Sequence, residues 1–288
     1  IQALKPLRFD HYRIELRLFQ PTWKKQANEA LHEARQLGYP CELAVFFTEH
    51  FEKQTQDLLT WLAAKKPPVS CVLLYHRDHP STPDNLASYV IPSLNTLIPG
   101  IPAGTGTNAN FAQLNRNRPK RTTDALLCFS VHPQEHASDN QTLVENLAGQ
   151  SYAVTSARRF SEGRGIWVSP VNLQRRFNAN RIFYQPPSRG NKYPDNTDAR
   201  IMSPFAAAWT VISLKYLAEA QVKGITWYET AGERGIFQGD RDSRWPLQFP
   251  ATRGTLFPVY HIFNFLAVVQ QEVEYVVYGK QGSPCTTY

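Results

Sequence analysis

Short apolar runs alternate along the chain with longer segments in which apolar positions recur at helical spacing. Seven runs have the length of strands, and the first five begin 24 to 31 residues apart, which is the length of a strand, a helix and two loops. These strands are expected to start near residues 11, 42, 70, 101, 125, 165 and 224. Helices are expected over 24–37, 52–64, 84–97, 140–151, 205–220 and 258–270.

Strands that alternate with helices predict a parallel sheet with right-handed crossovers. Runs such as Leu43–Phe47 and Cys71–Tyr75 are continuously apolar, which indicates burial on both faces of that sheet. No glycine-rich nucleotide-binding motif opens a helix, so a doubly wound nucleotide-binding sheet is disfavoured. The sequence therefore predicts an α/β fold of the TIM type, a (β/α)8 barrel. The eighth strand is expected upstream of the first residue, with Glu272–Tyr278 as the alternative.

The chain of 288 residues is expected to consist of one large domain and a short C-terminal segment. Residues 1–270 are expected to form the barrel, and residues 271–288 a C-terminal tail or the start of an appended β segment. No apolar run reaches the ~18 residues of a membrane span, and no signal peptide is visible. The four cysteines form no C-x-x-C pair, which fits reduced thiols and a cytoplasmic protein. The sequence carries no signal of oligomeric state.

The chain is basic, because 31 lysines and arginines outnumber 24 aspartates and glutamates for a net charge of +7. Basic residues cluster within 116–121 and 158–181. No known nucleic-acid-binding module with stacking aromatic residues accompanies them, so nucleic-acid binding is not expected. The clusters are interpreted as solvated surface or as a mild attraction to anionic ligands.

In a barrel of this type, reactive side chains come from the carboxyl ends of the strands. Glu229 ends one apolar strand, and its neighbours Trp227 and Tyr228 would desolvate the carboxylate, raise its pKa and suit it to acid–base work. Glu49 follows another strand in the same way, although it could instead cap the next helix. His132 is the third catalytic candidate. The candidates for substrate binding are Arg13, Glu15, His76, Asn108, Asn115, Glu135, Asn172 and Tyr228.

Residues 132–136 match the pattern H-x-x-E-H of some zinc enzymes. Pro133 follows a strand here and makes the helix that such a site needs doubtful, so His132 is expected to hydrogen-bond or transfer a proton instead. No metal and no cofactor are predicted. An asparagine amide such as that of Asn108 can hold a substrate hydroxyl or a developing oxyanion.

Several blocks of the sequence together resemble the D-apionate lactonases. The blocks are 105–111 (TGTNANF), 114–119 (LNRNRP), 130–137 (SVHPQEHA), 209–210 with 214–220, 228–232 (YETAG) and 257–261 (FPVYH). The resemblance implies a TIM-type barrel, flanked in the family by further sequence on both sides, and hydrolysis of a branched-pentose aldonolactone to its acid. Ala112-Gln113 departs from the Thr-Glu pair expected there. If that glutamate serves the family's chemistry, this chain acts on a different substrate or acts weakly.

The leading hypothesis is therefore a lactone hydrolase that acts on a small carbohydrate. Glu229 or Glu49 would activate a water molecule, while His132 with Asn108 or Arg13 would polarise the carbonyl. A glycoside hydrolase that uses Glu49 and Glu229 is the second hypothesis. The chain resembles barrel glycosidases, but Asn108 is followed by Ala109 where those enzymes usually have an Asn-Glu pair. A non-catalytic carbohydrate-binding barrel that uses Trp167, Trp227 and Trp245 is the third.

Overall fold

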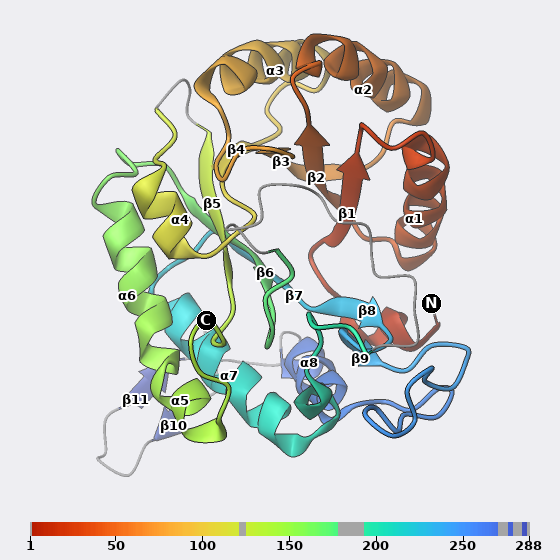
Figure 1. The fold of residues 1–288 in the computed structure, drawn as a ribbon, viewed down its shortest axis with the longest axis vertical. Coiled ribbons are helices and arrows are strands. Elements are labelled where there is room, and N and C mark those ends of the chain that lie inside the picture. Colours follow the sequence, from red (N-terminus) through yellow and green to blue (C-terminus); the bar gives the residue numbers. More distant parts are fainter. Residues whose placement is uncertain (1, 121–124, 178–192, 270–275, 279–283, 287–288) are drawn as a thin grey trace.

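A sheet of seven parallel strands, curled into a half-barrel, forms the centre of the molecule (Figure 1). The computed structural model describes residues 2–120, 125–177 and 193–269, and two short strands beyond them. Neighbours in the sheet follow chain order, which confirms the predicted TIM-type fold. The strands are β1 Tyr12–Arg17, β2 Cys41–Phe47, β3 Val69–His76, β4 Ala103–Gly106, β5 Leu126–Val131, β6 Ile166–Val171 and β7 Gly224–Trp227.

Helices cover the outside of this sheet (Figure 1). They are α1 Trp23–Leu37, α2 Phe51–Lys65, α3 Asp84–Leu97, α4 Phe111–Arg116, α5 Asn140–Glu145, α6 Leu147–Arg158, α7 Pro204–Glu219 and α8 Pro258–Val269, with 3₁₀ turns η1 Gln2–Leu7 and η2 Ala199–Met202. All six predicted helices are present, but the one expected over 140–151 is two helices that meet at Asn146. The short helix α4 was not predicted. No helix in these described ranges has the length and apolar character of a membrane span.

Helix boundaries follow local chemistry. Gly38 ends α1 with a φ of 76°, a left-handed conformation that costs glycine little. The Asp139 carboxylate accepts a hydrogen bond from the backbone N–H of Thr142 at 2.9 Å and caps α5. Asn110 caps α4 in the same way, through the N–H of Gln113.

Four short strands lie outside the main sheet. β8 Glu229–Ala231 pairs with β9 Gly235–Phe237, and β10 Val276–Tyr278 pairs with β11 Pro284–Thr286. Because β10 pairs with β11 and not with the main sheet, the alternative that 272–278 supplies an eighth barrel strand is wrong for its described residues. Within the described chain, β1 pairs only with β2 and β7 only with β6. The division into residues 1–270 and 271–288 stays a prediction.

The two faces of the sheet differ in chemistry, because successive side chains along a strand point to opposite faces. Leu43 and Val45 of β2 face α1–α3 in one apolar core, and Leu127 and Phe129 of β5 face α4–α8 in another. The inward face carries a small apolar layer of Ala44, Phe46, Cys71, Leu73, Tyr75 and Cys128. Cys71 and Cys128 are thus core residues as predicted, and burial raises the pKa of the Cys128 thiol to about 12.

Gly106 ends β4 where the chain touches β5. Its φ is 152°, and a Cβ atom there would lie 1.9 Å from the carbonyl oxygen of Cys128. We therefore expect Gly106→Ala to lower the free energy of unfolding by about 3 kcal/mol or more, because backbone has to move to relieve the contact. Urea unfolding would measure the change.

Gly149 is the matched control, because it lies in α6 and a Cβ atom there would meet nothing outside its own helix turn within 4 Å. Gly149→Ala should raise stability by up to about 1 kcal/mol through helix propensity. Equal stabilities of the two variants would contradict the close approach of β4 to β5.

Candidate functional site

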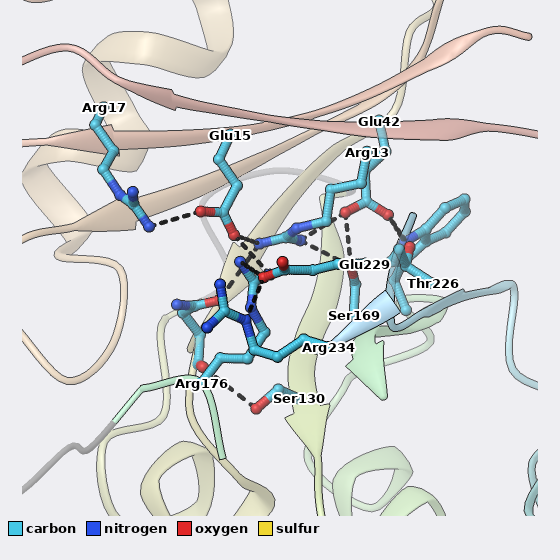
Figure 2. A network of polar contacts seen from close by, with 12 residues as sticks. Arg13, Glu15, Arg17, Glu42, Ser130, Ser169, Arg176, Thr226, Glu229 and Arg234 are labelled. Carbon is cyan, nitrogen blue, oxygen red and sulfur yellow. Dashed lines mark hydrogen bonds and ion pairs between the residues drawn. The ribbon is translucent and has the colours of Figure 1, made fainter. Parts of the chain in front are cut away.

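A fully buried carboxylate, Glu42, organises the inward face of the sheet (Figure 2). Arg13 stands opposite Glu42 in the register of β1 and β2 and donates to its Oε1 at 2.6 Å. Ser169 of β6 donates to the same oxygen at 2.6 Å. Trp167 of β6 and Thr226 of β7 donate to Oε2, the first at 2.7 Å. One side chain thereby connects the first two strands to the last two.

His11 completes this group from the segment before β1. Its Nε2 lies 2.8 Å from the Thr226 hydroxyl and 3.4 Å from Glu42 Oε2. Burial lowers the pKa of His11, with Glu42 opposing the shift. Burial by itself also disfavours ionised Glu42, but Arg13, His11 and the hydroxyl donors outweigh that cost and lower its pKa. Glu42 is therefore a buried, ionised and fully hydrogen-bonded carboxylate.

Arg13 continues this network along β1. Its Nη2 donates to Glu15 Oε1 at 3.3 Å and to Asn108 Oδ1 at 3.4 Å. Glu15 also accepts from Arg17 at 2.7 Å and from Arg176, in the segment after β6, at 3.0 Å. Burial opposes ionisation of Glu15, but Arg176, Arg13 and Arg17 outweigh it and hold its pKa well below its usual range.

Arg176 joins Glu15 to Glu229, the first residue of β8, which lies two positions after the end of β7 (Figure 2). Its two terminal nitrogens bind the two carboxylates, Nη1 to Glu15 at 3.0 Å and Nη2 to Glu229 Oε1 at 2.9 Å. Arg234, between β8 and β9, donates to the same Glu229 oxygen at 2.8 Å. Among the described residues, none donates a hydrogen bond to Glu229 Oε2. We call Arg13, Glu15, Arg17, Arg176, Glu229 and Arg234 the arginine–glutamate cluster.

The backbone at Tyr228 explains why Glu229 reaches this cluster. Thr226 points inward and Trp227 packs in the outer core, so alternation alone would send Tyr228 inward. Tyr228 instead has a φ of 46°, and its hydroxyl lies 2.7 Å from the Thr210 hydroxyl on α7. Glu229 thereby contacts the guanidinium groups of two arginines. The sequence predicted that Trp227 and Tyr228 would surround its carboxylate, but they do not.

Glu49 and His76 lie elsewhere on the carboxyl ends of the strands. The Glu49 side chain is 63% exposed, near Arg77 at 3.8 Å, and it shares no contact with Glu229. His76 accepts a hydrogen bond at Nδ1 from the backbone N–H of Asp78, and burial lowers its pKa. It orders the turn after β3.

His132 and Glu135 form a separate pair. The His132 side chain is buried, its Nε2 lies 3.5 Å from Glu135, and its Nδ1 has no hydrogen-bond partner in the described structure. Burial lowers the pKa of His132, which Glu135 partly offsets. Neither residue contacts the arginine–glutamate cluster. The described ranges contain no group of three or more metal-ligating side chains.

The three asparagine candidates have different surroundings. Asn108 accepts a hydrogen bond from Arg13 and so lies next to the arginine–glutamate cluster. Asn115 is exposed on α4, where its side-chain oxygen accepts from Arg118 at 2.6 Å, away from the cluster. Asn172 is buried after β6 and, with Tyr228, lines a cleft that Arg234 also reaches.

Sequence reasoning missed Glu42, Arg176 and Arg234. Glu42 interrupts an otherwise apolar strand, and that interruption was the available signal. Arg176 belongs to a basic group that was interpreted as solvated surface or as a mild attraction to anionic ligands, but its side chain is only 20% exposed and binds two carboxylates of the protein. Arg234 sits in a loop without a motif, and nothing in the sequence marked it.

Comparison with known proteins gives a family and a fold. The family model described as "D-apionate lactonase, TIM barrel domain" matches residues 1–271. No curated protein matches the chain. Solved structures with a similar fold include a β-glucuronidase from Ruminococcus gnavus in complex with D-glucuronic acid, with 11% identity and a TM-score of 0.60 over 92% of this chain and 44% of that one.

A glucosidase from Croceicoccus marinus is also similar, with 8% identity and a TM-score of 0.53 over 93% of this chain and 62% of that one. The chain thus spans about half the length of the β-glucuronidase. At these identities the likeness concerns the barrel fold alone.

The Glu42 network should dominate the stability of the sheet. We expect Glu42→Gln to lower the free energy of unfolding by about 3–5 kcal/mol, because it removes the nearer of the two counter-charges of the buried Arg13 cation. Asp57→Asn is the matched control on the exposed Lys24–Asp57 pair and should change stability by less than about 0.5 kcal/mol. Chemical denaturation would measure both, and similar losses would contradict the assigned role of Glu42.

The same network predicts a sensitivity to acid. The pKa values of Glu42 and Glu15 are lowered by folding, so their stabilisation is complete above the unfolded glutamate pKa of about 4.3 and is lost as pH falls below it. Replacing Glu42 by Gln removes one titrating group and should reduce the slope of stability against pH by up to about 1.4 kcal/mol per unit. Parallel curves for the two proteins between pH 4 and pH 2 would refute this linkage.

Proposed function

Since the chain belongs to the family of D-apionate lactonase TIM barrel domains, we propose that it hydrolyses a sugar aldonolactone of the D-apionolactone type to the aldonic acid. The observation that carries this proposal is the bridge that Arg176 makes between Glu15 and Glu229. Glu15 lies in β1, and Glu229 begins β8 just after the end of β7. It combines a carboxylate that can activate water with a guanidinium group that can bind the carbonyl oxygen.

The charge of the cluster suits this reaction. Lactone hydrolysis places negative charge on the carbonyl oxygen in the tetrahedral intermediate and leaves a carboxylate in the product. Arg13, Arg17, Arg176 and Arg234 face Glu15, Glu42 and Glu229. Guanidinium groups that are held in place beside Glu229 favour a developing oxyanion.

The two carboxylates of the cluster take different roles. Glu15 binds arginines through both oxygens and has a lowered pKa, so it positions Arg176 and is a poor proton acceptor. Glu229 binds both of its arginines through Oε1. Its Oε2 is the atom we assign to the attacking water.

The reaction then balances with one proton acceptor. Glu229 Oε2 takes a proton from water while the water oxygen bonds to the carbonyl carbon, and the Arg176 guanidinium stabilises the oxyanion. Collapse of the intermediate breaks the bond to the ring oxygen, which receives the proton back from Glu229. The product is a hydroxy acid, whose carboxyl group releases its proton to solvent and lies as a carboxylate against the arginines.

The other hypotheses find less support. A glycosidase that pairs Glu49 with Glu229 needs both carboxyl groups on one glycosidic bond, but Glu49 is exposed beside Arg77. A binding platform of tryptophans needs a shared face, but Trp167 donates to Glu42 inside the sheet and Trp227 packs against Phe263 in the outer core. A cytoplasmic location is also proposed, since Cys41, Cys71 and Cys128 are unpaired.

Substitution of the two glutamates should separate these functions. We expect Glu229→Gln to lower kcat for acid release from D-apionolactone by about 10²- to 10⁴-fold, because the amide cannot accept the proton of water. Glu49→Gln should retain activity close to wild type. A pH-stat titration, corrected for spontaneous hydrolysis, measures both.

Two results would overturn this assignment. Near-normal turnover by Glu229→Gln would remove Glu229 as the base. Cleavage of aryl glycosides, lost in both variants, would replace the lactonase with the glycosidase.

A further inference from the structure

A cleft opens beside Glu229, between the segments that follow β6 and β7. Arg234 lines this cleft and at the same time donates to Glu229. The cleft is therefore continuous with the arginine–glutamate cluster and lies within reach of a ligand whose carbonyl group is held there.

Part of the cleft wall is apolar and offers no free hydrogen-bonding group. Leu173 and Ile201 are each only 3% exposed, and Tyr228 is 5% exposed. The Tyr228 hydroxyl is engaged by Thr210, so Tyr228 offers the cleft its ring rather than a hydrogen-bonding group. Such a surface suits the C–H groups of a sugar.

The polar part of the wall holds an amide without a protein partner. Asn172 follows β6 and is only 6% exposed, yet its side-chain amide makes no hydrogen bond to any residue the structure describes. Its neighbour Asn196 accepts from Arg234 at 3.2 Å through Oδ1, which leaves its NH₂ group for a ligand. Asp198, by contrast, is already bound by Arg200 and Gln134. Because Asn172 lines the cleft, a ligand hydroxyl group there can form the hydrogen bond that the protein does not supply.

We propose that this cleft binds the hydroxylated part of the substrate, and that the Asn172 amide binds one of its hydroxyl groups. Asn172 is then a specificity-determining residue that favours polyhydroxylated lactones over unsubstituted ones. The identity of the substrate as a lactone rests on the function proposed above, whereas recognition of hydroxyl groups rests on the cleft itself.

The position of the cleft sets the orientation of the ligand. Arg234 lies at the junction, because it donates to Glu229 and lines the cleft. With the carbonyl group at Glu229 and Arg176, the hydroxyl groups extend past Arg234 toward Asn172.

The test compares two lactones with the same ring. Asn172→Leu removes both hydrogen-bonding atoms at similar size, so kcat/KM for D-apionolactone should fall by about 10- to 100-fold. For γ-butyrolactone, which has no hydroxyl substituents, kcat/KM should stay close to the wild-type value. Asn172→Ala, which needs no additional space, should show the same selective loss.

Asn95→Leu is the matched control, because Asn95 is exposed on α3. It should leave both substrates unaffected. An equal loss for both lactones in both Asn172 variants would reduce Asn172 to a structural role, and no loss for either would remove it from recognition. Either result would overturn the proposal while leaving lactone hydrolysis in place.

A binding measurement separates this subsite from the proposed function. Isothermal titration of D-apionate and of 4-hydroxybutyrate requires no turnover. The wild-type chain should bind D-apionate more tightly, and Asn172→Leu should abolish the difference. Discrimination without lactone hydrolysis would retain the subsite and reject the lactonase, whereas a wild-type chain that does not discriminate would reject the subsite.

Discussion

The buried charge of Glu42 is the constraint on which the rest of the inward face depends. A carboxylate removed from water is costly unless donors surround it, and β1, β6 and β7 each supply at least one. The described strands β1 and β7 share no backbone pairing, yet their side chains meet at this carboxylate. Glu42 thereby fixes how the two ends of the curled sheet face each other.

From Glu42 the charges alternate toward the cluster. Arg13 binds Glu42 and Glu15, Arg176 binds Glu15 and Glu229, and Glu229 also binds Arg234. Each arginine is held by a carboxylate on the side nearer the sheet interior. The guanidinium groups at the outer end are therefore positioned before any substrate arrives, which is the condition for electrostatic stabilisation of a transition state.

The sequence was sufficient for the fold and for part of the site. Strand and helix positions follow from local periodicity, and Glu229, Glu15, Arg13 and Asn108 follow from the rule about strand ends. Arg176 and Arg234 lie in loops, and their partners are distant in the chain, so only the folded geometry identifies them. Glu49 satisfies the same rule as Glu229 but points into solvent, because no local pattern fixes where a side chain after a strand will turn.

The left-handed backbone at Tyr228 is a second feature that local patterns do not reveal. A tyrosine rarely takes a positive φ, and here the hydrogen bond to Thr210 and burial in the outer core hold it there. The turn directs Glu229 toward Arg176 and places the tyrosine ring in the wall of the cleft. The conformation of Tyr228 thus determines both the direction of the Glu229 side chain and part of the wall of the cleft beside it.

The charged side chains of β1 have a consequence for the behaviour of the protein at high concentration. An edge strand with free backbone groups can recruit a strand from another molecule, and this is a common start of aggregation. β1 carries Arg13, Glu15 and Arg17 at every second position of one face, and β7 is only four residues long. A foreign apolar strand beside β1 would have to bury its side chains against these charges. In the described part of the sheet, the residues that build the cluster therefore also disfavour the addition of an apolar strand beside β1.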